Sequence, residues 1–225
     1  MIFQRKENRG IVSFSNFLIF FLLLLAVALK ASWLFDIDKM IQNITTIQPD
    51  SATAKIFQAV TFIGSPAVVL IISAVMIVYF IFQKQRITSL WIAFTILGGD
   101  AVAFAFKQLV KRPRPSDIIG AAHGYSFPSG HVFGTTILVL FVIVICVPRV
   151  AEASSRFWIQ VFMWVWLIII VISRVYLRSH YPSDVLGSLL LAASWWQLST
   201  MLYFRFYAAA NKVLKDQEIP EESQE

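Results

Sequence analysis

The sequence has few of the residues that build a soluble or disulfide-linked protein. Only 14% of its 225 residues are charged, and it has a single cysteine, Cys146. Soluble domains typically carry about 25% charged residues, and one cysteine forms neither an intramolecular disulfide nor a cysteine-based zinc cluster. Its three histidines, His123, His131 and His180, leave little material for a histidine-rich metal site. These shortages exclude a disulfide-rich secreted domain and argue against a soluble one.

Apolar residues are abundant instead, at 58% of the chain with a mean hydropathy of +0.71. A membrane-spanning helix needs about 20 mostly apolar residues. Six segments approach or exceed that length: Ile11–Leu29, Phe57–Phe82 with a Gly64-Ser65-Pro66 interruption, Ile87–Phe106, Val132–Val147, Phe157–Ser173 and Val185–Phe204. The sequence therefore predicts an all-α fold, a six-transmembrane-helix bundle. We expect residues 1–210 to form a single integral membrane domain, with 211–225 as a polar, disordered cytoplasmic tail.

The first span has a second interpretation. Arg5, Lys6 and Arg9 precede the apolar run, and Ala26-Val27-Ala28 resembles a signal-peptide cleavage site. However, the apolar region of a signal peptide has about 7–15 residues, and this run is longer. A retained helix is therefore favoured over a cleaved signal.

The distribution of basic residues predicts the orientation in the membrane. Ten of the 19 Lys and Arg residues lie at the two termini and in the 83–86 and 148–156 links. The other nine lie on the opposite side, where Lys107–Arg114 and Arg174–Arg178 contain six of them. If those six bind an anion, the rest follow the rule that basic loops face the cytoplasm. Both termini are then cytoplasmic, and the clustered cations lie at the extracytoplasmic face of the plasma membrane. The net charge of +6 could indicate nucleic-acid binding. The placement of the basic residues instead favours an anion at the membrane as the ligand.

Three of the outward segments carry residues suited to an anion. The first is Lys107-Gln-Leu-Val-Lys-Arg-Pro-Arg114-Pro115. Its prolines stop the preceding helix, and arginine and lysine bind phosphate as a fork and as a point charge. Taken alone, the segment also fits a basic collar at the membrane interface.

The second segment, Phe127-Pro-Ser129-Gly130-His131, directly precedes the fourth span. Ser129 can cap that helix with its side chain, and Gly130 lets the backbone approach a ligand closely. Because a helix N-terminus has free N–H groups and a positive dipole end, it binds anions. An ordinary capped helix start is the alternative.

The third segment runs from Ser173-Arg174 to His180-Tyr-Pro-Ser-Asp184, between the fifth and sixth spans. A histidine and an aspartate four residues apart can lie on the same side of a turn. A carboxylate that accepts from one imidazole nitrogen leaves the other nitrogen free as a base or nucleophile. A loop histidine beside an acid in a first helical turn is the alternative.

Lys-x6-Arg-Pro, Pro-Ser-Gly-His and Ser-Arg-x5-His-x3-Asp occur in this order over residues 107–184. Together they resemble the three-part signature of the type 2 phosphatidic acid phosphatase and vanadium haloperoxidase superfamily, and every signature position is matched. The six apolar spans argue against a haloperoxidase, because those enzymes are soluble.

The resemblance implies a role for each motif residue. His180 would be the nucleophile that forms a phosphohistidine, Asp184 would orient it, and His131 would protonate the leaving oxygen. The remaining signature positions would hold the phosphoryl oxygens: Lys107, Arg114, Ser129, Gly130 and Arg174. Side chains and a helix terminus would then neutralise the phosphate in place of Mg²⁺, so we expect neither a metal nor another cofactor.

Asp100 lies inside the third span, where an acid is costly. It precedes Lys107 by seven residues, about 10 Å along one helix face, so we expect either a supporting role for the cationic site or a structural acid. Gly98 and Gly99 beside it predict close helix packing. Lys111, Arg112 and Arg178 fall outside the signature; we expect them to face water, with contact to a lipid headgroup as the alternative.

The function expected from the resemblance is removal of the terminal phosphate from a lipid phosphate or lipid pyrophosphate. Undecaprenyl pyrophosphate, phosphatidylglycerol phosphate and phosphatidic acid are the candidate substrates. The alternatives are a phosphatase of a soluble phosphomonoester and a non-catalytic protein that binds or transports lipid phosphates. The sequence leaves the oligomeric state open.

Overall fold

The computed structural model describes residues 9–44, 49 and 51–214, and these contain helices but no strand. The helices are α1 (Arg9–Ala28), α2 (Ser32–Asn43), α3 (Ala52–Ile63), α4 (Pro66–Phe82), α5 (Arg86–Val110), α6 (Gly130–Phe141), α7 (Ala153–Tyr176) and α8 (Pro182–Leu214). A π-helical turn (Val142–Cys146) and a 3₁₀ turn (Val147–Arg149) continue α6. Within these described residues, six helical stretches are long and apolar enough to cross a membrane. The predicted all-α bundle with six transmembrane stretches is confirmed.

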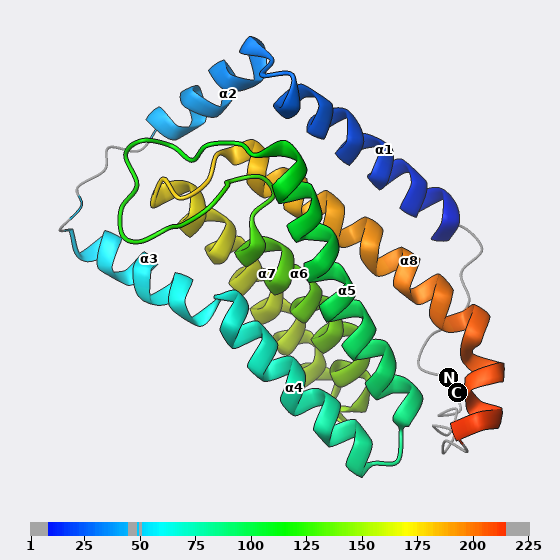
Figure 1. The fold of residues 1–225 in the computed structure, drawn as a ribbon. Helices are drawn as coiled ribbons and strands as arrows, with labels where there is room; N and C mark the ends of the chain where they lie inside the picture. Colours follow the sequence, from blue (N-terminus) through cyan, green and yellow to red (C-terminus); the bar gives the residue numbers. More distant parts are fainter. Residues whose placement is uncertain (1–8, 45–48, 50, 215–225) are drawn as a thin grey trace.

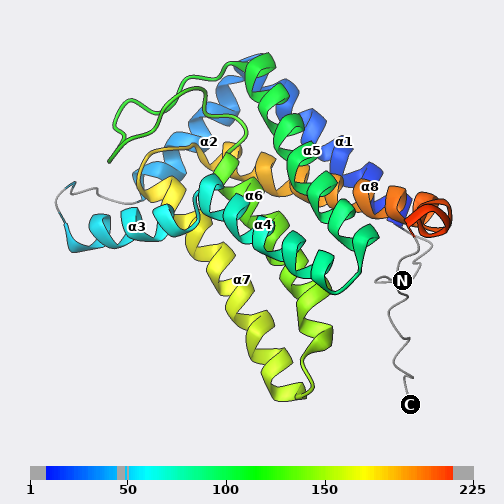
Figure 2. The ribbon, with the colours of Figure 1, turned by 60° about the horizontal axis from the view of Figure 1, so that its bottom comes forward.

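The two ends of the bundle differ in character (Figures 1 and 2). One end holds the start of α1, the α4–α5 and α6–α7 links and the end of α8. The other end holds α2, the long 111–129 loop and the short α7–α8 link. All three motif segments reach this second end, in agreement with the prediction of six spans that place them on the same side of the membrane.

The second predicted span is divided into α3 and α4 at the Gly64-Ser65-Pro66 interruption (Figure 1). The Ser65 side chain accepts a hydrogen bond from the Val68 backbone N–H, and Pro66 occupies the first turn of α4. Proline suits this position because its missing N–H would have had no partner in the helix. The break therefore follows from local sequence signals.

Close packing at Gly98 and Gly99 is confirmed. A Cβ atom added at Gly98 would lie 2.8 Å from Cζ2 of Trp195, and one at Gly99 would lie 2.9 Å from Cζ of Phe133. Only glycine lets α5 approach α8 and α6 this closely at the two positions that precede Asp100. Elsewhere, many large apolar side chains on α1, α4 and α7 face outward, as a lipid environment allows.

The predicted C-terminal tail begins too early. α8 continues to Leu214, so residues 211–214 are helical rather than disordered. Lys212 lies in the last turn of this helix, where a positive charge complements the negative end of the helix dipole. Residues 215–225, like Arg5 and Lys6 of the N-terminal basic cluster, lie outside the described residues.

Helix α2 is an element that the sequence analysis did not predict. It follows α1 after a short turn and has Leu34, Asp38 and Gln42 buried, each four residues from the next. Trp33 and Met40 are exposed on its other faces. The buried face of α2 thus carries two polar side chains, Asp38 and Gln42, beside Leu34, whereas a helix on a soluble protein buries mostly apolar ones.

Candidate active site

The three motif segments meet at the end of the bundle that holds α2. Lys107 lies in the last turn of α5, His131 in the first turn of α6 and Arg174 in the last turn of α7. His180 lies in the α7–α8 link, and Asp184 lies in the first turn of α8. The charges of Arg174, Arg114 and Lys107 all act on His131. The structure thus brings together residues that are up to 77 positions apart in the sequence.

The imidazole of His180 is buried, with 1% of its surface exposed. Its Nε2 lies 3.2 Å from Nη1 of Arg114, and its Nδ1 lies 2.8 Å from the Ser126 carbonyl oxygen. Because arginine only donates hydrogen bonds, Nε2 is the accepting nitrogen and Nδ1 carries the proton. Burial lowers the pKa of His180 to about 4, against the opposing effect of Asp184. At neutral pH the ring is therefore uncharged, with the lone pair of Nε2 directed toward a cation.

Asp184 lies beside His180 as the spacing of four predicts, but it is not the nearest acceptor. Its Oδ2 is 3.6 Å from Nδ1, longer than the 2.8 Å to the Ser126 carbonyl. Oδ2 also accepts a hydrogen bond from the Tyr181 backbone N–H, at 2.9 Å. The Ser126 carbonyl therefore fixes the tautomer most directly, and Asp184 adds a buried negative charge beside the ring.

The cations of the site are held by backbone carbonyl oxygens. Lys107 Nζ donates to the Tyr125 carbonyl at 3.1 Å. Arg114 donates to the carbonyls of Gly124, Ser179 and His123, at 3.0, 2.6 and 2.9 Å. Carbonyl oxygens fix these side chains in place without cancelling their charge.

Arg174 completes the cationic cluster. It is 3% exposed, and its Nε has no hydrogen-bond partner in the described part of the chain. An unpaired buried guanidinium nitrogen is costly, so an anion bound here would meet an unsatisfied donor. Among the described residues, no group of three or more His, Cys, Asp or Glu side chains is placed to hold a metal ion.

Ser129 occupies the N-cap position of α6, but the predicted side-chain cap is absent. Its backbone N–H donates to Ser188 Oγ at 2.6 Å, and its own Oγ is buried without a partner. The hydroxyl, rather than the backbone N–H, is therefore the group left for a ligand. A Cβ at Gly130 would meet only Pro66, at 3.8 Å, so protein atoms leave this position open.

The expectation that Lys111, Arg112 and Arg178 face water is wrong for the two arginines. Arg178 is buried and lies 3.4 Å from Asp117, whereas Lys111 is exposed. The Arg112 side chain is 11% exposed and forms ion pairs of 2.6 Å with both Asp184 and Asp38. Burial lowers the pKa of Arg112, but these two carboxylates outweigh it and raise the pKa above its usual value.

Asp38 is the residue of this region that the sequence analysis missed. Its only available signal was weak: Asp38 and Gln42 lie four residues apart, in a segment that also carries Asp36 and Lys39. Asp100, by contrast, was singled out, but no ion pair within the described residues joins it to Lys107. Its supporting role stays a prediction.

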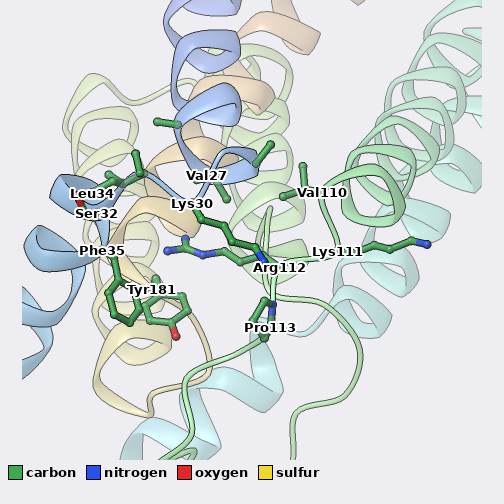
Figure 3. Close-up of a pocket in the computed structure, with 13 residues that line it drawn as sticks. Val27, Lys30, Ser32, Leu34, Phe35, Val110, Lys111, Arg112, Pro113 and Tyr181 are labelled. Carbon is green, nitrogen blue, oxygen red and sulfur yellow. The ribbon is translucent and has the colours of Figure 1, made fainter.

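A cavity of about 450 Å³ adjoins the site on the side of α1 and α2 (Figure 3). Small apolar residues at the end of α1 and in the turn before α2, including Ala26, Val27 and Ala31, form one part of its wall. Arg112 and Tyr181 form the part next to the site, and Lys111 points away from them in Figure 3. The motif residues do not line this cavity, so it lies beside the cationic cluster rather than within it.

Comparison with known proteins agrees with this geometry. The sequence model of the PAP2 superfamily matches residues 88–208, more than half of the chain. Among solved structures, the chain is similar to a transmembrane PAP2-type phosphatidylglycerolphosphate phosphatase from Bacillus subtilis, with 20% identity and a TM-score of 0.73. The similarity covers 86% of this chain and 96% of that one, and at this identity it shows a shared fold. A comparison with curated proteins found no match.

The matched region contains all three motifs, from Lys107 to Asp184. The family match, the shared membrane fold and the convergence of the motif residues are separate observations that agree. The chain belongs to the PAP2 superfamily, which confirms the family predicted from the motifs.

Proposed function

We propose that this protein is a membrane lipid phosphatase that transfers a terminal phosphoryl group to His180 and then to water. Membership of the PAP2 superfamily and six membrane-spanning stretches support a membrane phosphatase. The observation that carries the chemistry is the state of His180. A buried neutral imidazole has the lone pair of Nε2 directed at Arg114 and lies within reach of the charge of Arg174.

In the proposed reaction, His180 Nε2 forms a bond to phosphorus while the bond from phosphorus to the leaving oxygen breaks. The Nδ1 proton stays on the ring and keeps its hydrogen bond to the Ser126 carbonyl oxygen. Asp184 stabilises the new positive charge of the ring. Water then attacks phosphorus, the P–N bond breaks, and inorganic phosphate leaves. Lys107, Arg114 and Arg174 offset the charge of the phosphoryl oxygens, as positioning and neutralisation dominate phosphoryl transfer.

His131 is the proposed general acid. It lies in the first turn of α6, within the electrostatic influence of His180 and the three cations. A bound phosphate would offset that positive charge, so His131 can carry a proton when substrate is present. It gives this proton to the departing oxygen in the first step. In the second step it takes a proton from the attacking water, which returns it to its starting state.

A lipid is favoured over a soluble ester as the substrate. The cavity beside the site has apolar walls from the end of α1, and two neighbours of its lining residues in the sequence, Leu29 and Trp33, are exposed. Such walls suit the glycerol and upper acyl region of a lipid better than a hydrated sugar. The Bacillus subtilis neighbour is a phosphatidylglycerolphosphate phosphatase, so that lipid belongs in any substrate panel, with phosphatidic acid and undecaprenyl pyrophosphate.

The proposed site faces the outside of the plasma membrane. The two short links at the opposite end of the bundle, residues 83–86 and 148–156, carry Lys84, Arg86, Arg149 and Arg156. At the end that holds the site, Arg112 and Arg178 form ion pairs with acids. Basic loops are retained in the cytoplasm. The phosphate of an outer-leaflet lipid would then lie at the level of His180.

Phosphate release should survive metal chelation and be inhibited by vanadate. Purified protein is assayed with the three lipids and a soluble ester, with and without EDTA, because the cations replace a metal in the proposed site. Arg114→Gln should lose turnover and bind vanadate more weakly, whereas Lys111→Gln, which changes an exposed cation nearby, should keep both turnover and its inhibition by vanadate. Loss of activity in EDTA that Mg²⁺ restores would contradict the metal-free mechanism.

The two motif histidines should be separable by leaving group. His180→Ala should abolish turnover of every substrate. His131→Ala should cost about 10²–10⁴-fold with phosphatidic acid, whose alkoxide leaves poorly, less with a lipid pyrophosphate and least with nitrophenyl phosphate. The measurement is the ratio of kcat losses between substrates. Equal losses for phosphatidic acid and nitrophenyl phosphate would show that His131 is not the acid.

Single cysteines should report the sidedness of the site. In a Cys146→Ser background, cysteines placed in the Asp117–Gly124 loop should react with an impermeant thiol reagent in intact cells. Cysteines at Lys84 or Lys212 should react only after lysis, because those positions are at the other end of the bundle. The reverse labelling pattern would place the active site in the cytoplasm.

A further inference from the structure

Arg112 links two buried carboxylates that come from opposite ends of the chain. Its Nη1 donates to Asp184 Oδ1 and its Nη2 donates to Asp38 Oδ2, both at 2.6 Å. Asp38 and Asp184 are 1% and 0% exposed. The guanidinium also lies over the Tyr181 ring, 4.1 Å from its centroid (Figure 3). A planar guanidinium with one carboxylate on each side is held in a single orientation.

Helix α2 fixes the start of α8 through the same aspartate. Asp38 Oδ1 accepts from the Ser183 backbone N–H at 2.9 Å, and its Oδ2 accepts from Ser183 Oγ at 2.6 Å. One turn later, Gln42 Nε2 donates to the His180 carbonyl oxygen at 3.3 Å. One face of α2 therefore contacts both ends of the segment that presents His180 and Asp184.

The net charge of Asp38, Asp184 and Arg112 affects how well the His180 ring can become positive. Asp38 and Asp184 contribute two negative charges and Arg112 one positive charge, so the group has a net charge of −1 next to a neutral imidazole. When Nε2 forms its bond to phosphorus, the imidazole ring becomes positive. The summed charge of Asp38, Asp184, Arg112 and the ring is then zero. Without Asp38, Arg112 would pair with Asp184 alone and cancel its charge before the reaction begins.

We propose that Asp38 is a positioning residue of the reaction, which engages Arg112 so that the Asp184 charge stays available to the His180 ring. Asp38 touches neither substrate nor imidazole, and it acts through Arg112 and Ser183. The inference rests on the proposed function, because it assigns the charge of Asp184 to the reacting ring. It adds α2, which lies outside the three motifs, to the parts of the protein that the reaction needs.

The test compares four chains in detergent: the wild type, Asp38→Asn, the double variant Asp38→Asn/Arg112→Gln, and Asp36→Asn. Asp36 is an exposed acid on the same helix and is the matched control. Asp38→Asn should lower kcat about 10–100-fold, the usual cost of losing a partner of a catalytic group, with KM changed less than about threefold. Asp36→Asn should match the wild type.

The double variant separates charge from structure. It leaves Asp184 as the single carboxylate of the group, so the net charge of −1 returns although more contacts are lost. We expect its kcat to exceed that of Asp38→Asn by about threefold or more. A purely structural role predicts the reverse, because the double variant loses more of the contacts that stabilise the site than Asp38→Asn does. A double variant slower than Asp38→Asn, or an Asp38→Asn chain as fast as the wild type, overturns the proposal.

Vanadate binding gives a second readout that needs no turnover. Vanadate that bonds to His180 Nε2 makes the ring positive, whereas inorganic phosphate binds without forming that bond. Asp38→Asn should therefore weaken vanadate binding about tenfold and phosphate binding less than about threefold, as measured by calorimetry. Equal effects on the two anions, or no vanadate binding by the wild type, contradict the proposal. If the wild type releases no phosphate from any substrate, the proposed function fails, while the vanadate comparison still decides the role of Asp38.

Discussion

Repulsion among buried cations is the constraint on which the rest of this site depends. Lys107, Arg114 and Arg174 lie close enough to act on one another at the end of a helix bundle. Like charges in such partly buried surroundings repel strongly. Carbonyl oxygens of the 111–129 loop and of the α7–α8 link hold two of these side chains by hydrogen bonds. The long loop and its neighbours thus hold these positive charges together at one end of the bundle.

Much of this architecture could be predicted because its signals are local. Apolar runs define the spans, the Ser65-Pro66 pair marks a helix start, and the family signature identifies residues that converge at one end of the bundle. Lysine and arginine are charged wherever their partners lie, so the sequence alone indicates that Lys107 and Arg114 are cations of the site. Helix ends are less well defined, and α8 accordingly runs past the predicted boundary to Leu214.

The partners of these residues could not be predicted, because they are distant in sequence or lack a side-chain signature. Asp38 meets Arg112 across 74 positions and Ser183 across 145. The nearest acceptor for His180 Nδ1 is a backbone carbonyl, that of Ser126, which any residue could supply. Arg112 itself was expected at the surface, since nothing near it in the sequence indicates that two buried carboxylates surround it. Long-range pairing of this kind decides which nitrogen of His180 is free.

The central claim is that the Nε2 atom of His180 forms a covalent bond to phosphorus, and rapid-quench trapping tests it most directly. The protein is mixed with a lipid phosphate carrying ³²P in its terminal group, quenched in base within one turnover, and digested. The account predicts label on the peptide that contains His180, stable in base and lost in acid, as expected for a phosphoramidate bond. Phosphate released in the first turnover without labelled protein, or label on any other side chain, would contradict it.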